Sequence, residues 1–140
     1  MRTSGRAFVD TNVLVYAVDD ADPGKRDVAR RVLADARPDE LVLSTQVLGE
    51  FYVVVTRKLE RPLSESAAAN AVTQLGRLPT VIADADLVRS GISVSREARI
   101  SYWDGLILAA AAVSGCDRVL TEDLESGATI GTILIENPFA

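Results

Sequence analysis

The sequence predicts an α/β sandwich in which helices flank a mostly parallel central sheet of five strands. Short apolar segments that suit strands alternate along the chain with longer segments of helical periodicity. The composition, 48% hydrophobic and 25% charged, is ordinary for a globular protein. A length of 140 residues allows one well-packed core, so we expect a single domain over residues 1–140.

The first half of the chain contains two of the predicted strands. Residues 7–9 form an apolar run that stops at Asp10, and a second apolar run resumes almost at once. The Asp-Asp-Ala-Asp-Pro-Gly segment that follows marks a break. We expect these elements: strand 7–9, helix 13–18, helix 25–36, strand 41–43, helix 45–59 capped by Ser44 or Thr45, and helix 65–75 capped by Ser64.

The second half supplies three more strands and the most apolar helix. Asp84 and Ser101 each precede a helical segment, and Gly115 ends the second of these. The expected elements are strand 79–82, helix 85–95, helix 102–114, strand 118–121 and strand 132–135. Parallel strands point the same way, so Asp10 and the residues after Leu120 should emerge at one edge of the sheet, where α/β proteins bind ligands.

Two residue types are informative because they are scarce. Histidine is absent, which excludes Ser-His and Cys-His nucleophile pairs and His-ligated zinc. The single cysteine, Cys116, excludes an internal disulfide and a cysteine-based zinc cage. Chemistry must therefore come from carboxylates, hydroxyls, backbone groups, Arg or Lys, together with a hard cation that prefers oxygen ligands.

The charge balance limits the kinds of partner. There are 20 acidic and 15 basic residues, and the net charge of −5 does not favour general binding to nucleic acid or to an anionic membrane. A nucleic-acid enzyme is still compatible if its basic residues are clustered and its acids lie in a metal site. No apolar run reaches membrane-spanning length, so we expect a cytoplasmic protein without a membrane partner.

Four carboxylates interrupt apolar runs, where an acid is unfavourable. Asp10 ends the first strand, and Glu50 lies near the start of helix 45–59. Asp104 occupies the first turn of the most apolar helix, and Asp123 follows the fourth strand. The predicted topology places all four at the edge where the parallel strands end.

The two acids at strand ends also have structural explanations. Asp10 could cap the helix that follows it, and so could Thr11 or Asn12. Asp123 could cap the turn after the fourth strand, and Glu122 could replace it as the acid that points inward. The sequence leaves these alternatives open.

The two helix acids have structural alternatives too. Asp104 lies three residues after Ser101, as the acid of a capping box does, and Glu50 could belong to a solvated helix face. Gathered at one edge, carboxylates about 5 Å apart would repel by on the order of 3 kcal/mol per pair. A divalent cation relieves that repulsion, and a ligand set without His or Cys favours Mg²⁺ or Mn²⁺, which suits a phosphate substrate.

Five segments carry these acids and their neighbours. In order they are DTNVLVY from Asp10, QVLGEFY around Glu50, YWDGLILAAA around Asp104, LTEDL around Asp123, and the closing I-x-NPF. Together they resemble the PIN-domain ribonucleases, in particular the VapC toxins of prokaryotic VapBC toxin–antitoxin pairs. The resemblance extends over essentially the whole chain and implies a PIN-like α/β/α sandwich.

The resemblance also implies an activity and the residues that perform it. The expected activity is that of a Mg²⁺- or Mn²⁺-dependent endoribonuclease, the toxin of a type II toxin–antitoxin pair. The implied site consists of the catalytic acids Asp10, Glu50, Asp104 and Asp123, of which Asp10, Asp104 and Asp123 would bind metal, and the supporting polar residues Thr11, Asn12 and Thr121.

The implied partners are the RNA substrate, a VapB-like antitoxin whose C-terminal segment covers the groove of the toxin, and a second copy that forms a homodimer. Arg96, Arg99 and Tyr102 lie just before or at the start of the helix that carries Asp104, so they are candidate RNA contacts. Basic residues of this kind could also simply lie on a solvated face. For Trp103 we expect packing in the core or in the dimer.

Other functions compete with this interpretation. A PIN-fold nuclease outside a toxin–antitoxin pair and a non-catalytic PIN-like interaction domain share most of the same expectations. A phosphotransferase with Asp10 as nucleophile would need a second acid two residues later, where this chain has Asn12. A covalent acyl-phosphate on Asp10 would favour that third alternative.

Overall fold

A central sheet of six strands, in the order β3-β2-β1-β4-β6-β5, organises the protein. The structure is a computed structural model that describes residues 5–140, so the first four residues of the expected 1–140 domain lie outside the described part. The strands are Arg6–Val9 (β1), Leu41–Ser44 (β2), Thr80–Val81 (β3), Cys116–Leu120 (β4), Thr129–Ile130 (β5) and Ile133–Glu136 (β6). All pairings are parallel except that between β5 and β6.

The prediction of a mostly parallel sheet flanked by helices is confirmed, but the number of strands was wrong. The sixth strand is β5, which has two residues and pairs with β6 through a hairpin that contains Gly131 at a φ of 62°. Glycine adopts this left-handed conformation without steric cost. A two-residue strand is too short to show any alternation of apolar and polar residues, so the sequence gives no signal for it.

Six helices connect the strands of the described part of the chain. They are Thr11–Tyr16 (α1), Pro23–Asp35 (α2), Thr45–Arg57 (α3), Glu65–Leu75 (α4), Ala85–Ala98 (α5) and Tyr102–Val113 (α6). Helix α1 begins two residues earlier than expected because Asp10 itself caps it, accepting a hydrogen bond from the Thr11 amide. Helix α5 continues past residue 95 and ends where Arg99 adopts a left-handed conformation.

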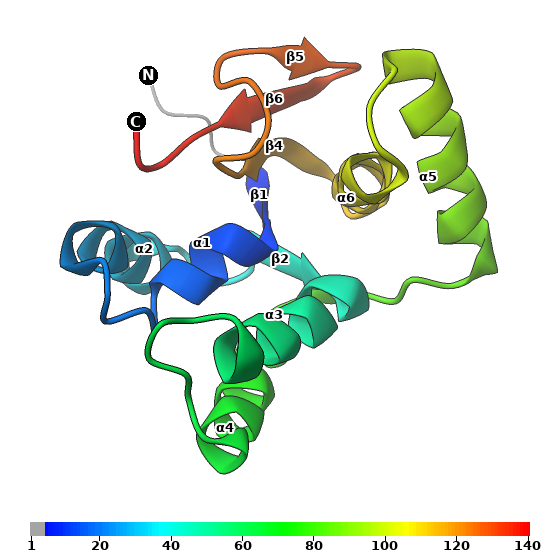
Figure 1. Cartoon of the computed structure of the whole chain (residues 1–140). Helices are drawn as coiled ribbons and strands as arrows, with labels where there is room; N and C mark the ends of the chain where they lie inside the picture. The colour runs from blue at the N-terminus through cyan, green and yellow to red at the C-terminus, as the bar shows by residue number, and fades with distance from the viewer. Residues whose placement is uncertain (1–4) are drawn as a thin grey trace.

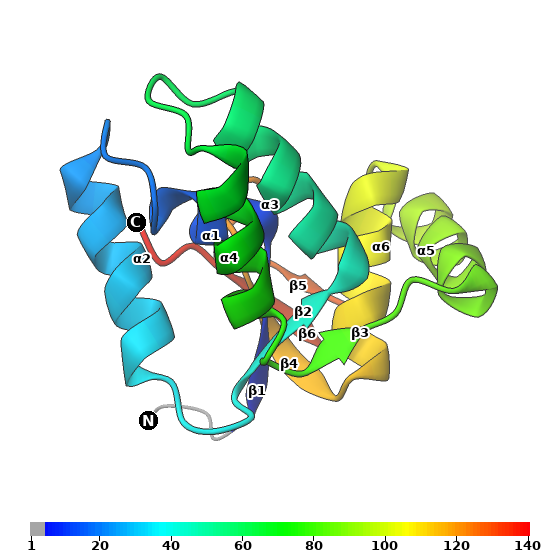
Figure 2. The same ribbon diagram turned by 90° about the horizontal axis from the view of Figure 1, so that it is seen from below.

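The helices form layers on the two sides of the sheet. Figure 1 shows α1 and α2 on one side and α5 and α6 on the other, with α3 and α4 below the β2 edge. Figure 2, seen from below, shows the same separation of α2 from the α5–α6 pair. The paired residues Phe8, Val119 and Ile135 of β1, β4 and β6 are fully buried, as expected for strands of a parallel sheet covered on both faces.

Close packing of α5 on α6 depends on two glycines. A Cβ atom added to Gly105 would lie 2.5 Å from the carbonyl oxygen of Gly91, closer than any real contact of this kind. The helices can therefore approach each other only because both positions lack a side chain. Within residues 5–140, no helix has the length and apolar character that crossing a bilayer requires.

The parallel arrangement sets the position of the candidate site. The Asp10 amide donates to the Leu120 carbonyl oxygen over 3.0 Å, which holds the end of β1 beside the end of β4. Helix α3 starts at Thr45, directly after β2. The carboxyl ends of β1, β2 and β4 and the first turns of α1 and α3 thus share one edge of the sheet.

Candidate active site

Asp10 is the most buried acid of this edge, with a relative exposure of 8%. Its carboxylate accepts hydrogen bonds from the Thr11 amide (2.7 Å), the Thr121 hydroxyl (2.8 Å) and, over 3.4 Å, the side-chain amide of Asn12. All three donors are neutral. No basic side chain in the described part of the chain forms an ion pair with Asp10.

The environment of Asp10 disfavours its charge. The pKa of Asp10 is raised from 3.8 to about 6, chiefly because burial removes the carboxylate from water and from its hydration. The negative charges of Asp123 and Glu50 contribute to this rise, while the hydrogen bonds from Thr121 and Thr11 oppose it. Asp10 is therefore a carboxylate whose negative charge is only partly compensated by its neighbours.

Asn12 joins the two strand-end acids. Its amide nitrogen lies 3.1 Å from Asp123 Oδ2 and 3.1 Å from Thr121 Oγ1, in addition to the longer contact with Asp10. Its carbonyl oxygen accepts a hydrogen bond from the Glu122 amide over 3.3 Å. A single side chain of α1 thus connects Asp10 to the loop that follows β4.

Glu50 is exposed, yet both of its carboxylate oxygens are held. Thr11 Oγ1 donates to Oε2 over 3.2 Å, and Gln46 Nε2 donates to Oε1 over 2.6 Å. The bond from Thr11 connects α3 to the start of α1. The sequence analysis missed Gln46, although its spacing of four residues from Glu50 on one helix face was a signal that could have identified it.

The structure distinguishes the two acids that follow β4. Asp123 faces Asn12, and its amide donates to Thr121 Oγ1 over 3.1 Å. Glu122 points to the other side of the loop, where it binds Lys25 and Tyr16. Of the two acids left open by the sequence, Asp123 is the one on the side of Asp10.

Asp104 lies outside this hydrogen-bonded group. It is half-buried in the first turn of α6, and its amide donates to Ser101 Oγ over 3.1 Å, so Ser101 caps the helix as expected, but the Asp104 carboxylate does not complete a capping box. Its carboxylate forms no hydrogen bond or ion pair with another residue of the described part. The structure therefore brings together three of the four expected acids, Asp10, Glu50 and Asp123.

The proposed RNA contacts lie near the start of α6. Arg96 and Arg99 are exposed at the end of α5, and neither forms an ion pair within residues 5–140. The Tyr102 ring is half-buried and meets Trp103 edge-on, with the ring centroids 4.9 Å apart. Trp103 is 61% exposed, so in the single chain it does not pack in the core. With Glu50 and Gln46 it lines a cavity of about 580 Å³.

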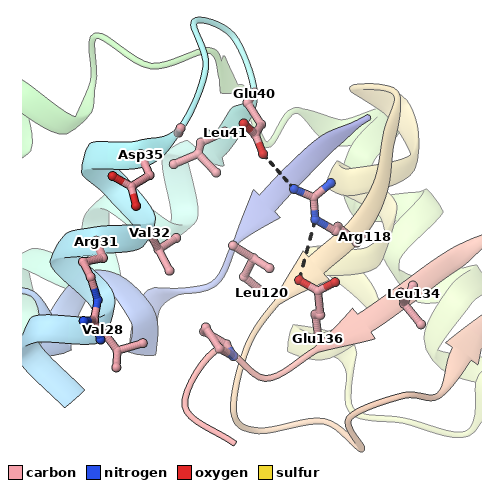
Figure 3. Close-up of a pocket in the computed structure, with 12 residues that line it drawn as sticks. Val28, Arg31, Val32, Asp35, Glu40, Leu41, Arg118, Leu120, Leu134 and Glu136 are labelled. Atoms are coloured by element: carbon pink, nitrogen blue, oxygen red, sulfur yellow. Dashed lines mark hydrogen bonds and ion pairs between the residues drawn. The ribbon is translucent and has the colours of Figure 1, made fainter. Parts of the chain in front are cut away.

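A second cavity, of about 550 Å³, lies between α2 and the strands β4 and β6 (Figure 3). In its wall Arg118 binds Glu40 over 2.8 Å and approaches Glu136 to 3.7 Å, and Arg31 and Asp35 of α2 also line it. Leu41, Leu120 and other apolar side chains form much of the remaining wall. Since Arg118 is paired with acids, this cavity does not share the uncompensated negative charge of the Asp10 edge.

The residues of the Asp10 edge are chemically suited to a hard divalent cation. They offer carboxylate, hydroxyl and amide oxygens, and the raised pKa of Asp10 means that its negative charge is disfavoured when no cation is present. Among residues 5–140, no three acidic side chains are grouped closely enough to enclose a metal ion.

Comparison with known proteins gives one family match. A protein-family model described as "PIN domain" matches residues 7–126, which contain every residue of the candidate site. None of the curated proteins matches the chain significantly.

Several solved structures share the fold. Mycobacterium tuberculosis VapC20, described as a sarcin-ricin loop cleaving toxin, is 21% identical with a TM-score of 0.64, over 81% of this chain and 86% of that one. A toxin–antitoxin complex from Klebsiella pneumoniae is 19% identical with a TM-score of 0.70, over 94% and 97%. DNA-bound VapBC from Salmonella typhimurium is 21% identical with a TM-score of 0.65, over 96% and 98%.

Proposed function

The chain belongs to the PIN-domain family, and from this premise we propose that it is a metal-dependent endoribonuclease, the toxin of a type II toxin–antitoxin pair. The observation that carries the proposal is the buried carboxylate of Asp10. Its pKa is raised to about 6, and two further acids adjoin it without a basic partner among the described residues. A divalent cation bound by these three acids would stabilise their charged form.

The residues proposed to hold Mg²⁺ or Mn²⁺ are Asp10, Asp104 and Asp123. Asp104 is included because it begins the helix next to this edge and its carboxylate has no competing partner within residues 5–140. When bound, the ion supplies Lewis acidity, which lowers the pKa of a water molecule and neutralises charge on the phosphate. That chemistry suits hydrolysis of an RNA phosphodiester.

The chain's own residues orient these groups. Thr121 and the Thr11 amide fix both oxygens of Asp10, and Asn12 fixes Asp123 relative to it. Glu50 is exposed and held by Thr11 and Gln46, and its proposed role is to orient a water molecule beside the phosphate. Arg96, Arg99 and Tyr102 are proposed to contact the RNA on the α5–α6 side of the site.

The toxin role is supported by the similar structures. Three of them are named as VapC or toxin–antitoxin proteins, and VapC20 is described as a sarcin-ricin loop cleaving toxin. We propose a VapB-like antitoxin as the partner of this chain and a homodimer as its assembly. Val53, Ile82 and Trp103 are large exposed apolar side chains, and a second copy would cover such side chains.

Cleavage of RNA in the presence of Mn²⁺ tests the proposed function. The unmutated chain should cut RNA in Mn²⁺ or Mg²⁺ and stop when EDTA is added, and Asp10→Asn should lose the activity. Glu125→Gln is the matched control, since Glu125 is an exposed acid of the same loop outside the hydrogen-bonded group. Cleavage that survives both EDTA and Asp10→Asn would falsify the assignment of the chemistry to this site.

The toxin role needs a separate test. If a small VapB-like protein is encoded immediately upstream, its co-expression with the chain should yield a complex in which cleavage is suppressed. A free nuclease whose activity is unaffected by that protein would instead be a PIN-fold nuclease outside a toxin–antitoxin pair.

A further inference from the structure

Glu122 is bound on the face of the loop that points away from Asp10. Lys25 Nζ donates to Glu122 Oε2 over 2.9 Å, and the Tyr16 hydroxyl donates to Glu122 Oε1 over 2.5 Å. Lys25 Nζ also donates to the Tyr16 hydroxyl over 3.3 Å. The three polar groups form a closed triangle that joins α1, α2 and the loop after β4.

An aromatic pair supports this triangle from the end of the chain. The Phe139 ring meets the Tyr16 ring edge-on, with the centroids 4.9 Å apart. The ammonium group of Lys25 lies 4.8 Å from the centroid of Tyr16 and 5.7 Å from that of Phe139, within the range of a cation–π interaction. Phe139 is itself held by a bond from its amide to Asn137 Oδ1 over 2.9 Å.

The triangle is attached directly to the candidate metal site. Glu122 precedes Asp123 in the chain, and its amide donates to Asn12, which also binds Asp123. The loop after β4 is therefore held on one side by Asn12 and on the other by Lys25 and Tyr16. Glu122 and Asp123 share one peptide bond, so the position of Glu122 constrains the backbone that carries Asp123.

We propose that Lys25, Tyr16 and Phe139 are positioning residues that act through Glu122 to fix Asp123 at the metal site. This inference rests on the proposed function, because it assumes that Asp123 contributes to binding a divalent cation. It gives the C-terminal segment a role in that binding although Phe139 lies behind the site. The contacts also explain why a Glu and an Asp stand side by side here, with one acid holding the loop and the other facing Asp10.

The direction in which Lys25→Met changes the affinity for a cation distinguishes a positioning role from a purely electrostatic effect. Lys25→Met removes a positive charge near the site, and by Coulomb's law this change alone would make a cation bind more tightly. Loss of positioning has the opposite effect, since a displaced Asp123 binds the cation less well. Removing an outer partner of a metal ligand typically weakens metal binding 10–100-fold.

The test is calorimetric titration of the full chain with Mn²⁺ alone, without RNA. Lys25→Met should weaken Mn²⁺ binding roughly tenfold, and Lys25→Arg, which keeps the cation, should recover most of the affinity. Tyr16→Phe keeps the ring against Phe139 and loses only the hydroxyl, so it should weaken binding by a smaller factor. Thermal melting without metal establishes whether each variant is folded. If Lys25→Met does not fold, the Mn²⁺ affinity of Tyr16→Phe tests the positioning role instead.

Arg89→Met is the matched control. It removes one positive charge from an exposed ion pair with Asp86 on α5, which has no bond to the loop after β4. Its Mn²⁺ affinity should equal that of the unmutated chain. Unchanged or tighter binding by folded Lys25→Met and Tyr16→Phe would overturn the positioning role alone. Failure of the unmutated chain to bind Mn²⁺ would overturn the proposed metal site and this inference with it.

Discussion

The side-chain amide of Asn12 lies 3.1 Å from Asp123 Oδ2, although the two residues are 111 positions apart in the chain. The same amide contacts Asp10 and Thr121. A neutral donor at this position can approach several oxygens without adding charge, so Asn12 connects the acids while leaving their negative charge available to a cation. Four predictions follow from this arrangement and from the surfaces around it.

The stability of the protein should depend on pH through Asp10. Burial raises the pKa of Asp10 from 3.8 to about 6, so between these values the folded state binds more protons than the unfolded state. The free energy of unfolding should therefore fall as pH rises through this range, by about 3 kcal/mol for this group. Urea denaturation in EDTA at pH 4 and pH 7.5 measures the change.

The variant Asp10→Asn isolates that contribution. It should lack this part of the pH dependence, and it should gain little stability from Mn²⁺, whereas Mn²⁺ should stabilise the unmutated chain by mass action at pH 7.5. An identical pH profile in the variant and the unmutated chain would show that Asp10 is not the titrating group.

Replacing Asn12 by aspartate tests whether the edge is short of positive charge. Aspartate has nearly the same shape as asparagine, but at position 12 it puts a third carboxylate beside Asp10 and Asp123. In EDTA it should lower the free energy of unfolding by about 1–3 kcal/mol, because hydrogen bonds become contacts between like charges. Mn²⁺ should restore much of the loss. Asn70→Asp, on the exposed face of α4, makes the same chemical change away from the site and should show neither effect.

Gln46 should contribute to activity but not to stability. Its Nε2 holds Glu50, while its Oε1 is buried without a hydrogen-bond partner among the described residues. Gln46→Leu removes the bond to Glu50 and also removes the unsatisfied acceptor, so the free energy of unfolding should change little. RNA cleavage should fall on the order of tenfold, as for other lost partners of site residues. The control is Gln74→Leu, a substitution at an exposed position of α4. If the single-turnover cleavage rate of Gln46→Leu equals that of Gln74→Leu, Gln46 has no role in orienting Glu50.

The two ends of α6 should differ in their effect on assembly. Trp103 and Val113 are 61% and 70% exposed, but only Trp103 adjoins Val53 in the cavity next to Glu50. Introducing a charge by Trp103→Glu should convert the proposed homodimer to a monomer, because a carboxylate cannot be buried in an apolar interface without a partner. Val113→Glu should leave the dimer intact. Light scattering coupled to gel filtration gives both masses, and a dimer of Trp103→Glu would place the interface elsewhere.

The sequence predicted those features that depend on neighbouring residues. The alternation of apolar runs and helical periodicity identified the sheet and its helices, and the family to which the chain belongs was confirmed by the match over residues 7–126. The caps Ser64, Asp84 and Ser101 were predicted, and Ser44 was one of two candidates, because a cap bonds to an amide within three residues and the signal is local. The edge strand β5 was missed because two residues carry no periodicity.

Tertiary structure alone decided which side chains meet. The sequence placed four acids at the same edge, but whether Glu122 or Asp123 turns toward Asp10 depends on Lys25, Tyr16 and Asn12, which come from other elements of the fold. That Asp104 stays outside the hydrogen-bonded group likewise depends on how α6 packs. Local propensities act over a few residues along the chain, whereas the bonds of a side chain are chosen among whatever groups folding brings within about 3 Å.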